Sequence, residues 1–375
     1  MVVAAVAIVI AAEPVAPGAA QPAGGAKTAA AVKPQPKVEV AFVLDTTGSM
    51  SGLIEGAKAK IWYIANQIVL GEPKPIVRMG LVAYRDKGDE YVTRVYDLTD
   101  NIDQVYTDLM KFQTGGGGDT PEHVNKALDD AVHKLSWSAD KKTLKIIYLV
   151  GDSPPHNEYK DTPTYDKLTQ QAIEKGIYVN TILCGGNTET AGIWKEIAKG
   201  AEGTFLAIAQ DGGVVEIATP FDADMAKLNR DLVGTAVVYG SAREQAAQKA
   251  LNTGAASYAA PAAAERGKFA LNSGKVADRD LVKDAKEGKV DVAKLKQEEL
   301  PADMQKMSPE EQKKHLADMS AKREKVTTEL KELSAKRDEY IKQELAKNKD
   351  AKKGFDSQVL EVLKSQAARR DITYK

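Results

Sequence analysis

The chain has 375 residues, and its 52 basic and 53 acidic side chains leave a formal net charge of −1. This balance provides no bulk attraction to nucleic acid or to an anionic membrane surface, so we expect no nucleic-acid partner. The single cysteine, Cys184, excludes an intramolecular disulfide framework and a cysteine zinc cluster. The length is sufficient for one sizeable domain and an accessory region.

Residues 2–12 are continuously apolar, and residues 13–37 are rich in Ala, Pro and Gly. The first stretch has the character of a secretory signal, although no Lys or Arg precedes Lys27, and it is short for a bilayer-spanning helix. It predicts a signal peptide or a short anchor, which would be the only contact with a membrane. The second stretch lacks core-forming side chains and predicts a linker. We therefore expect a periplasmic or secreted protein.

From Val38 to about residue 232, strand-like and helix-like segments alternate, which predicts an α/β domain with a doubly wound, mostly parallel six-stranded sheet flanked by helices. The predicted strands cover residues 40–44, 77–84, 91–98, 144–150, 177–183 and 204–209. The predicted helices cover residues 54–70, 102–112, 121–135, 165–175, 193–199 and 213–232. Pro121 suits a first helical position, with Thr120 or Asp119 as its cap.

Beyond residue 232 the composition changes, and residues 233–302 predict a helical connector. A Ser-Pro-Glu-Glu start at Ser308 begins a helix that meets no breaker until about Asn348. Apolar residues at spacings of three and four predict a weak coiled coil or a helical hairpin over residues 303–375, with self-association through 309–348. Residues 355–367 are expected to fold back onto the long helix. A solvated helical spacer is the alternative.

The sequence VEVAFVLDTTGSM reads as a buried strand whose carboxyl end carries Asp45 and the hydroxyls of Thr47 and Ser49. Thr120 lies on the glycine-rich loop TGGGGDTPEH, and Asp152, in YLVGDSPPH, follows the predicted strand over residues 144–150. In doubly wound sheets, ligands bind outside the carboxyl ends of the strands. Oxygen-only donors on such loops favour a hard divalent cation, above all Mg²⁺, with Mn²⁺ or Ca²⁺ as alternatives.

These residues resemble the metal-ion-dependent adhesion site (MIDAS) of the von Willebrand factor A (VWA) domain family, as found in bacterial proteins. The family motif Asp-x-Ser-x-Ser appears here as Asp-Thr-Thr-Gly-Ser from Asp45, and the other two parts follow in the family's order. The resemblance spans residues 38–232. It implies that Thr47 and Ser49 bind the metal directly and that Thr120 binds directly or through water. It also implies that Asp45 and Asp152 act through water.

Four further polar residues are candidates for an outer role or for contact with a partner. Asp119 is equally well explained as a helix cap. For Glu122, a charge that complements the helix dipole is the favoured interpretation, and Asp86 is most simply explained as a turn residue. His156 is the only histidine near the predicted site, and a loop hydrogen bond is favoured over metal binding. The run of four glycines before Asp119 lets the backbone approach a metal closely.

The resemblance implies a metal-dependent protein-binding module, with adhesion or scaffolding as its role, and residues 2–12 predict that this module is exported. A partner carboxylate would bind through the cation. No P-loop, kinase signature or recognisable Ser–His–Asp grouping occurs, so we expect no enzymatic activity. The alternatives are a non-catalytic adaptor subunit of a separate enzyme or ATPase assembly, and a structural role in which the long helix is the functional part.

Overall fold

The structure is a computed structural model that describes residues 35–118, 120–213, 216–347 and 354–374. The predicted signal or anchor, most of the predicted linker and Asp119 lie outside these ranges. None of the helices in the described ranges combines the length and the apolar character that crossing a bilayer requires.

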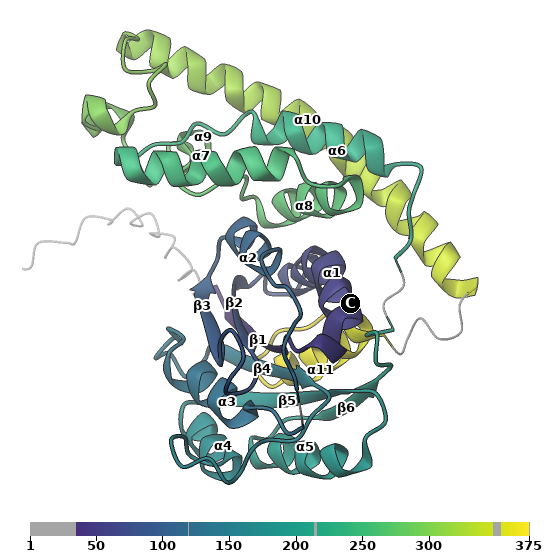
Figure 1. The fold of residues 1–375 in the computed structure, drawn as a ribbon. Coiled ribbons are helices and arrows are strands. Elements are labelled where there is room, and N and C mark those ends of the chain that lie inside the picture. Colours follow the sequence, from purple (N-terminus) through teal and green to yellow (C-terminus); the bar gives the residue numbers. More distant parts are fainter. Residues whose placement is uncertain (1–34, 119, 214–215, 348–353, 375) are drawn as a thin grey trace, which may run out of the picture. The chain divides into compact units, whose positions relative to one another are not determined.

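A six-stranded sheet forms the centre of the α/β part, in the order β3-β2-β1-β4-β5-β6 (Figure 1). Its strands are β1 (Lys37–Asp45), β2 (Ile76–Tyr84), β3 (Thr93–Thr99), β4 (Leu144–Gly151), β5 (Ile177–Cys184) and β6 (Phe205–Ile208). All neighbours are parallel except β2 and β3, which form an antiparallel edge pair. The predicted mostly parallel, doubly wound sheet is thereby confirmed. The order reverses direction between β1 and β4, where such sheets place their ligands.

Side chains of the sheet alternate between two apolar cores, as the period of a strand requires. Along β1, Val40, Phe42 and Leu44 belong to one core, and Ala41 and Val43 belong to the other. Because both faces are covered, β1 reads as a continuous apolar run in the sequence.

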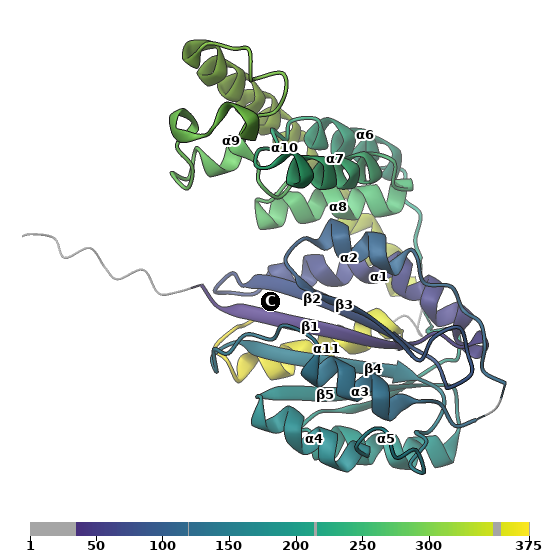
Figure 2. The same cartoon turned by 60° about the vertical axis from the view of Figure 1, so that its left-hand side comes forward.

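Each face of the sheet is covered by its own set of helices (Figure 2). One face carries α1 (Ser51–Val69), α2 (Ile102–Leu109) and α11 (Phe355–Ala368), and the other carries α3 (Val124–His133), α4 (Tyr165–Glu174) and α5 (Thr188–Gly200). The largest buried side chains on the first face include Trp62 of α1, and Trp194 of α5 is buried on the second. The two layers leave the loops at the strand ends accessible for a binding site.

The helix α11 is a structural part of the sheet domain, although it follows the long helix in the chain. The ring of Phe355 packs at a tilt against that of Phe42 with centroids 6.0 Å apart, and the Tyr148 hydroxyl donates to the Val359 carbonyl at 2.8 Å. Residue 373 also pairs with residue 72 through two backbone hydrogen bonds. The prediction that residues 355–367 fold back onto the long helix is therefore wrong, because their apolar side chains complete the core over β1 and β4.

The helices between β6 and α11 form an insertion in the sheet domain. They are α6 (Asp222–Val233), α7 (Ala242–Ala256), α8 (Ala260–Ser273), the short α9 (Leu281–Asp284) and α10 (Pro309–Lys347), with 3-10 turns at Val292–Lys294 and Gln297–Glu299. The chain leaves and re-enters the sheet domain at one place, because the Phe355 amide donates to the Gly212 carbonyl at 2.9 Å. The sheet domain is thus built from two separate stretches of sequence, and a boundary near residue 232 does not close it.

The long helix α10 begins at Pro309, as its capping residues predict, and Ser308 accepts from the Glu311 amide at 3.3 Å. Its apolar seam packs inside the chain against α6 and α8, where Val326 and Leu330 are buried. The charged seam position Arg337 is also buried, and its guanidinium pairs with Asp222 of α6 at 2.7 Å and with Glu265 of α8. In the described residues the chain's own helices cover this seam, which was predicted to form a coiled coil, and self-association through 309–348 stays a prediction.

Two helices near the predicted site begin later than the sequence predicts. The helix expected over residues 121–135 begins at Val124, and the His123 ring, instead of residue 119 or 120, caps it by accepting from the Lys126 amide at 3.3 Å. Residues 120–122 are not helical, and Glu122 forms an isolated bridge with Pro155. The helix expected over 213–232 begins at Asp222, because residues 216–220 are not helical.

Candidate functional site

The loop after β1 brings the two predicted hydroxyl ligands together. Thr47 is buried, Ser49 is exposed, and their hydroxyl oxygens lie 3.3 Å apart. The Thr47 hydroxyl donates to Oδ1 of Asp45 at 2.6 Å, and the Thr47 amide donates to the same oxygen at 2.8 Å. Because the Thr47 proton points to Asp45, the lone pairs of the Thr47 oxygen remain free to face a cation.

Asp45 lies at the end of β1 with its carboxylate fully buried. Its Oδ2 has no hydrogen-bond partner within the described part of the chain. Burial raises the pKa of Asp45 to about 7; hydrogen bonds from Thr47 oppose this shift, and the charge of Asp152 adds to it. Near neutral pH, the carboxylate is therefore held close to its protonation point, and a nearby cation would favour its ionised form.

The glycine run packs directly against the loop after β1. The Gly115 amide donates to the Thr46 carbonyl at 3.1 Å, and the Gly48 amide donates to the Gly116 carbonyl at 3.4 Å. Gly117 has a φ of +75°, and a Cβ at this position would lie 3.0 Å from Cβ of Thr47. Glycine at position 117 is thus required both by the backbone conformation and by the close approach to Thr47.

Glu122 is closer to the predicted site than the sequence suggests. Its side chain is only 2% exposed, and its Oε1 would be 3.3 Å from a Cβ at Gly117, on the side where Thr47 also lies. Its Oε2 has no hydrogen-bond partner among the described residues. The pKa of Glu122 is raised to about 9, first by burial and then by the charges of Asp45 and three other aspartates. The interpretation as a helix-dipole complement is wrong, because Glu122 precedes the helix and turns inward.

Asp152 follows β4 and joins the site through the neighbouring loops. Its Oδ2 accepts from Nε2 of Gln210 at 2.8 Å, and its Oδ1 accepts from the Ser153 hydroxyl at 2.9 Å. The same Gln210 amide group lies 3.3 Å from the carbonyl oxygen of Ser49. Gln210 therefore connects the loops that follow β1, β4 and β6. Sequence reasoning missed this residue, although its position directly after a predicted strand was an available signal.

Thr120 is exposed, and its hydroxyl forms no hydrogen bond with another site residue in the described ranges. Its neighbour Asp119 lies outside those ranges. The structure therefore brings together Asp45, Thr47 and Ser49 and links Asp152 to them through Gln210, whereas the exposed Thr120 is not joined to them by a hydrogen bond in the described ranges. Among the described residues, no three carboxylate, imidazole or thiolate groups lie close enough to hold an ion by themselves.

Asp86 and His156 form a buried pair beside the site. Nε2 of His156 lies 3.4 Å from Oδ2 of Asp86, which also accepts from the Tyr159 hydroxyl at 3.0 Å. The His156 ring stacks on Tyr159 with centroids 4.2 Å apart. Both residues of the pair are less than a tenth exposed, so they support the loops and do not face a partner. The interpretation of Asp86 as a simple turn residue is therefore incomplete.

The donors at this site fit a hard divalent cation. Two adjacent hydroxyl oxygens lie at the surface end, and two buried carboxylates, those of Asp45 and Glu122, each retain an oxygen without a partner. A buried carboxylate oxygen without a hydrogen bond is costly, and a cation is the partner that relieves that cost together with the mutual repulsion of the acids. The oxygen-only chemistry matches Mg²⁺, Mn²⁺ or Ca²⁺ better than a thiophilic metal.

Known proteins are similar to this chain over part of the sheet domain. Residues 39–219 match the family model of the von Willebrand factor A domain. Over 136 residues, 36% of this chain, the sequence is 31% identical to von Willebrand factor A domain-containing protein 7 of Homo sapiens, of which 14% is covered. Over 124 residues, 33% of this chain, it is 26% identical to an ariadne-like RING finger protein of Acanthamoeba polyphaga mimivirus, of which 12% is covered. The chain thus spans a small part of the length of each relative.

Among solved structures, the protein is similar to the conserved hypothetical protein BatB from Bacteroides thetaiotaomicron, with 16% identity and a TM-score of 0.34 over 46% of this chain and 90% of that one. It is also similar to proximal thread matrix protein 1 from the mussel byssus, in a structure with a zinc-occupied MIDAS motif. That likeness has 16% identity and a TM-score of 0.38, and it covers 47% of this chain and 43% of the other.

Proposed function

We propose that the chain is a metal-dependent protein-binding module, because residues 39–219 match the family model of the von Willebrand factor A domain. A divalent cation would be held by the hydroxyls of Thr47 and Ser49, with the carboxylates of Asp45, Glu122 and Asp152 around it. A bound cation supplies a positive charge and an exchangeable coordination position, which an acidic side chain of a protein partner can occupy. The proposed role is binding, in adhesion or scaffolding, without catalysis.

The observation that carries the proposal is the pair of buried, partnerless carboxylate oxygens behind an exposed hydroxyl. A cation would favour the ionised forms of Asp45 and Glu122, whose pKa values are raised, and Thr47 directs its proton toward Asp45 and its lone pairs elsewhere. Ser49 and Gly116 are exposed, so the surface end of the site is accessible to a partner. Gln210 holds Asp152 in place and ties it to the Ser49 loop.

Export is part of the proposal, and Mg²⁺ is the expected ion. The apolar residues 2–12 support export, and the oxygen donors support a hard cation. Mass spectrometry of the mature N-terminus in cell fractions tests the first point. A chain recovered only from the cytosol with residues 2–12 intact would contradict export.

The binding function is tested in two steps with matched serine variants. Calorimetry with Mg²⁺ and Mn²⁺ is expected to show one site that Ser49→Ala weakens by about tenfold or more, because a direct ligand is lost. Ser51→Ala is the control, because Ser51 is an exposed serine two positions further along that begins α1. An array of peptides containing Glu or Asp, each paired with its Gln or Asn copy, is then probed with and without the ion. Capture that ignores both the ion and the acidic residue would reject the proposal.

A further inference from the structure

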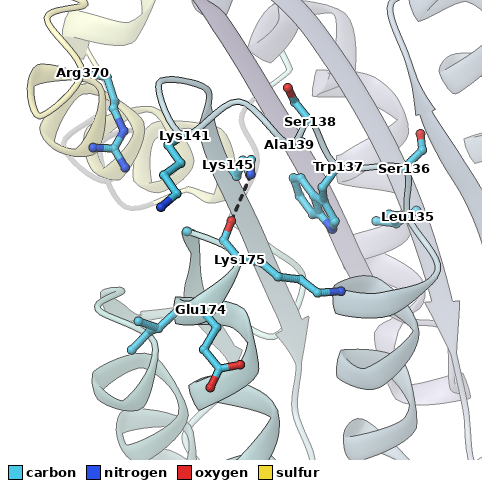
Figure 3. Close-up of a pocket in the computed structure, with 12 residues that line it drawn as sticks. Leu135, Ser136, Trp137, Ser138, Ala139, Lys141, Lys145, Glu174, Lys175 and Arg370 are labelled. Carbon is cyan, nitrogen blue, oxygen red and sulfur yellow. Dashed lines mark hydrogen bonds between the residues drawn. The ribbon is translucent and has the colours of Figure 1, made fainter.

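A cavity of about 510 Å³ lies at the end of the sheet opposite the proposed cation site. It is formed by the residues between α3 and β4, the turn between α4 and β5, and the segment after α11 (Figure 3). The amino ends of β4 and β5 meet here, whereas the cation site lies at the carboxyl ends of the strands. The volume falls within the range of small-molecule sites, about 300 to 1,000 Å³.

Four cationic side chains line this cavity: Lys141, Lys145, Lys175 and Arg370. None of them forms an ion pair with a carboxylate of the described residues, although many lysines and arginines elsewhere in the chain do. Within the same ranges, the buried Nε of Arg370 also has no hydrogen-bond partner. The Lys175 amine donates to the Val132 carbonyl at 2.9 Å. The positive charges around the cavity repel one another, so a bound anion would relieve both the repulsion and the missing contact of Arg370.

Lys145 gives the cavity a buried, oriented donor. Its side chain is only 5% exposed, and its amine donates to the carbonyl of Lys175 at 3.0 Å, which leaves two protons for another acceptor. Burial lowers the pKa of Lys145; Glu39 and Asp140 act against this shift, and the positive charges of Arg370 and Lys175 act with it. The coupling to Arg370 and Lys175 shows that these charges act on the same amine.

The carboxylates in the neighbourhood do not neutralise the cavity. Glu39 pairs with Arg78 at 2.7 Å and accepts from the Ser138 amide at 2.8 Å. Asp140 accepts from the Lys142 amide at 2.9 Å. Glu174 lines the cavity, but its side chain extends away from the lysine amines (Figure 3). The residues that line the cavity thus carry four positive charges against the single negative charge of Glu174.

From these contacts we infer that the cavity is a binding site for a small phosphorylated molecule that carries two or more negative charges. Lysine amines and an arginine guanidinium are the groups that proteins use to bind phosphate oxygens. The half-buried Trp137 forms part of the wall, and its indole nitrogen is already bonded to the Ala131 carbonyl at 2.8 Å. Its ring thus offers an apolar surface for a planar group, as in a nucleotide. Arg370 connects the ligand to the segment that follows α11.

Calorimetry of the full chain with inorganic pyrophosphate, ADP and citrate, in buffer freed of divalent cations, tests the inference. Pyrophosphate and ADP are expected to bind, and Lys141→Gln and Arg370→Gln are each expected to weaken binding by about tenfold or more. Lys142→Gln is the matched control, because Lys142 is exposed and does not line the cavity. Both test positions lie at the surface side of the cavity, so circular dichroism should show an unchanged fold.

Two further measurements separate this site from the cation site and identify the ligand class. Asp45→Asn is expected to leave pyrophosphate binding unchanged. ADP is expected to change the tryptophan fluorescence of the wild type but not of Trp137→Phe, because Trp62 and Trp194 are buried elsewhere. The inference is overturned by an absence of pyrophosphate binding at millimolar concentration, by equal binding in the Lys141 and Arg370 variants, or by citrate binding as tightly as pyrophosphate.

Discussion

Asp45 offers the sharpest test of how the cation site is built. Its carboxylate is fully buried, and its pKa is raised from 3.8 to about 7, chiefly by burial. A group whose pKa is raised in the folded state stabilises the fold below its unfolded pKa and loses that contribution as the pH rises through the folded pKa. Without metal, the protein should therefore lose stability between about pH 4 and pH 7 through Asp45.

The magnitude follows from the size of the shift. A change from 3.8 to about 7 is about three pKa units, and at about 1.4 kcal/mol per unit it corresponds to about 4 kcal/mol. Asp45→Asn has almost the same shape as the protonated acid, and its Oδ1 can still accept both hydrogen bonds from Thr47. Without metal, the variant should match the wild type near pH 4 and exceed it by up to about 4 kcal/mol at pH 8.5.

Urea unfolding followed by circular dichroism measures this difference at both pH values. Added Mg²⁺ should raise the unfolding midpoint of the wild type at pH 8.5 and leave that of Asp45→Asn nearly unchanged, because the variant lacks the charge that attracts the ion. If the variant is less stable than the wild type at pH 8.5 without metal, the burial of an unpaired charge is not the dominant effect. If Mg²⁺ raised the unfolding midpoints of the wild type and of Asp45→Asn equally, Asp45 would not contribute to cation binding.

Three more substitutions test separate parts of the structure. Gly117→Ala should lower Mg²⁺ affinity by about tenfold or more in calorimetry, because the φ of +75° at this position is unfavourable for alanine. Gly118→Ala is the control and should leave the affinity unchanged, because its Cβ would have open space. Arg337→Ala leaves the buried carboxylates of Asp222 and Glu265 without their cation. It should lower the free energy of unfolding in urea by about 3 to 5 kcal/mol. The exposed Lys336→Ala is the control, and an equal loss in both variants would contradict the buried network. Phe355→Ala should cost about 3 to 5 kcal/mol, and a cost below about 1 kcal/mol would show that α11 is not part of the sheet core.

The sequence was informative where local pattern and fold coincide. The continuous apolar run before Asp45 predicted a strand buried on both faces, and β1 contributes alternate residues to two cores. The spacing of Thr47 and Ser49 after that strand correctly placed two hydroxyls on one loop. Both features depend on residues that are close together in the chain.

The features that the sequence did not predict depend on packing between residues far apart in the chain. Residues 355–368 are amphipathic, and nothing in their own sequence decides whether the apolar face covers the long helix or the sheet. The seam of α10 likewise suits either a second chain or the chain's own helices, and the pairing of Arg337 with Asp222 and Glu265 decides the matter only in three dimensions. Glu122 was underrated because the helix was expected to include it, whereas its bridge with Pro155 directs it inward.

The split sheet domain has a consequence for how the protein is made on the ribosome. The strands and the helices up to α5 emerge early, but the part of one apolar face of β1 and β4 that α11 covers stays exposed until residues 355–374 have been synthesised. The intervening helical segment can bury much of its own apolar surface during that interval. A nascent chain stalled before Phe355 would thus expose a hydrophobic sheet surface of the kind that chaperones bind.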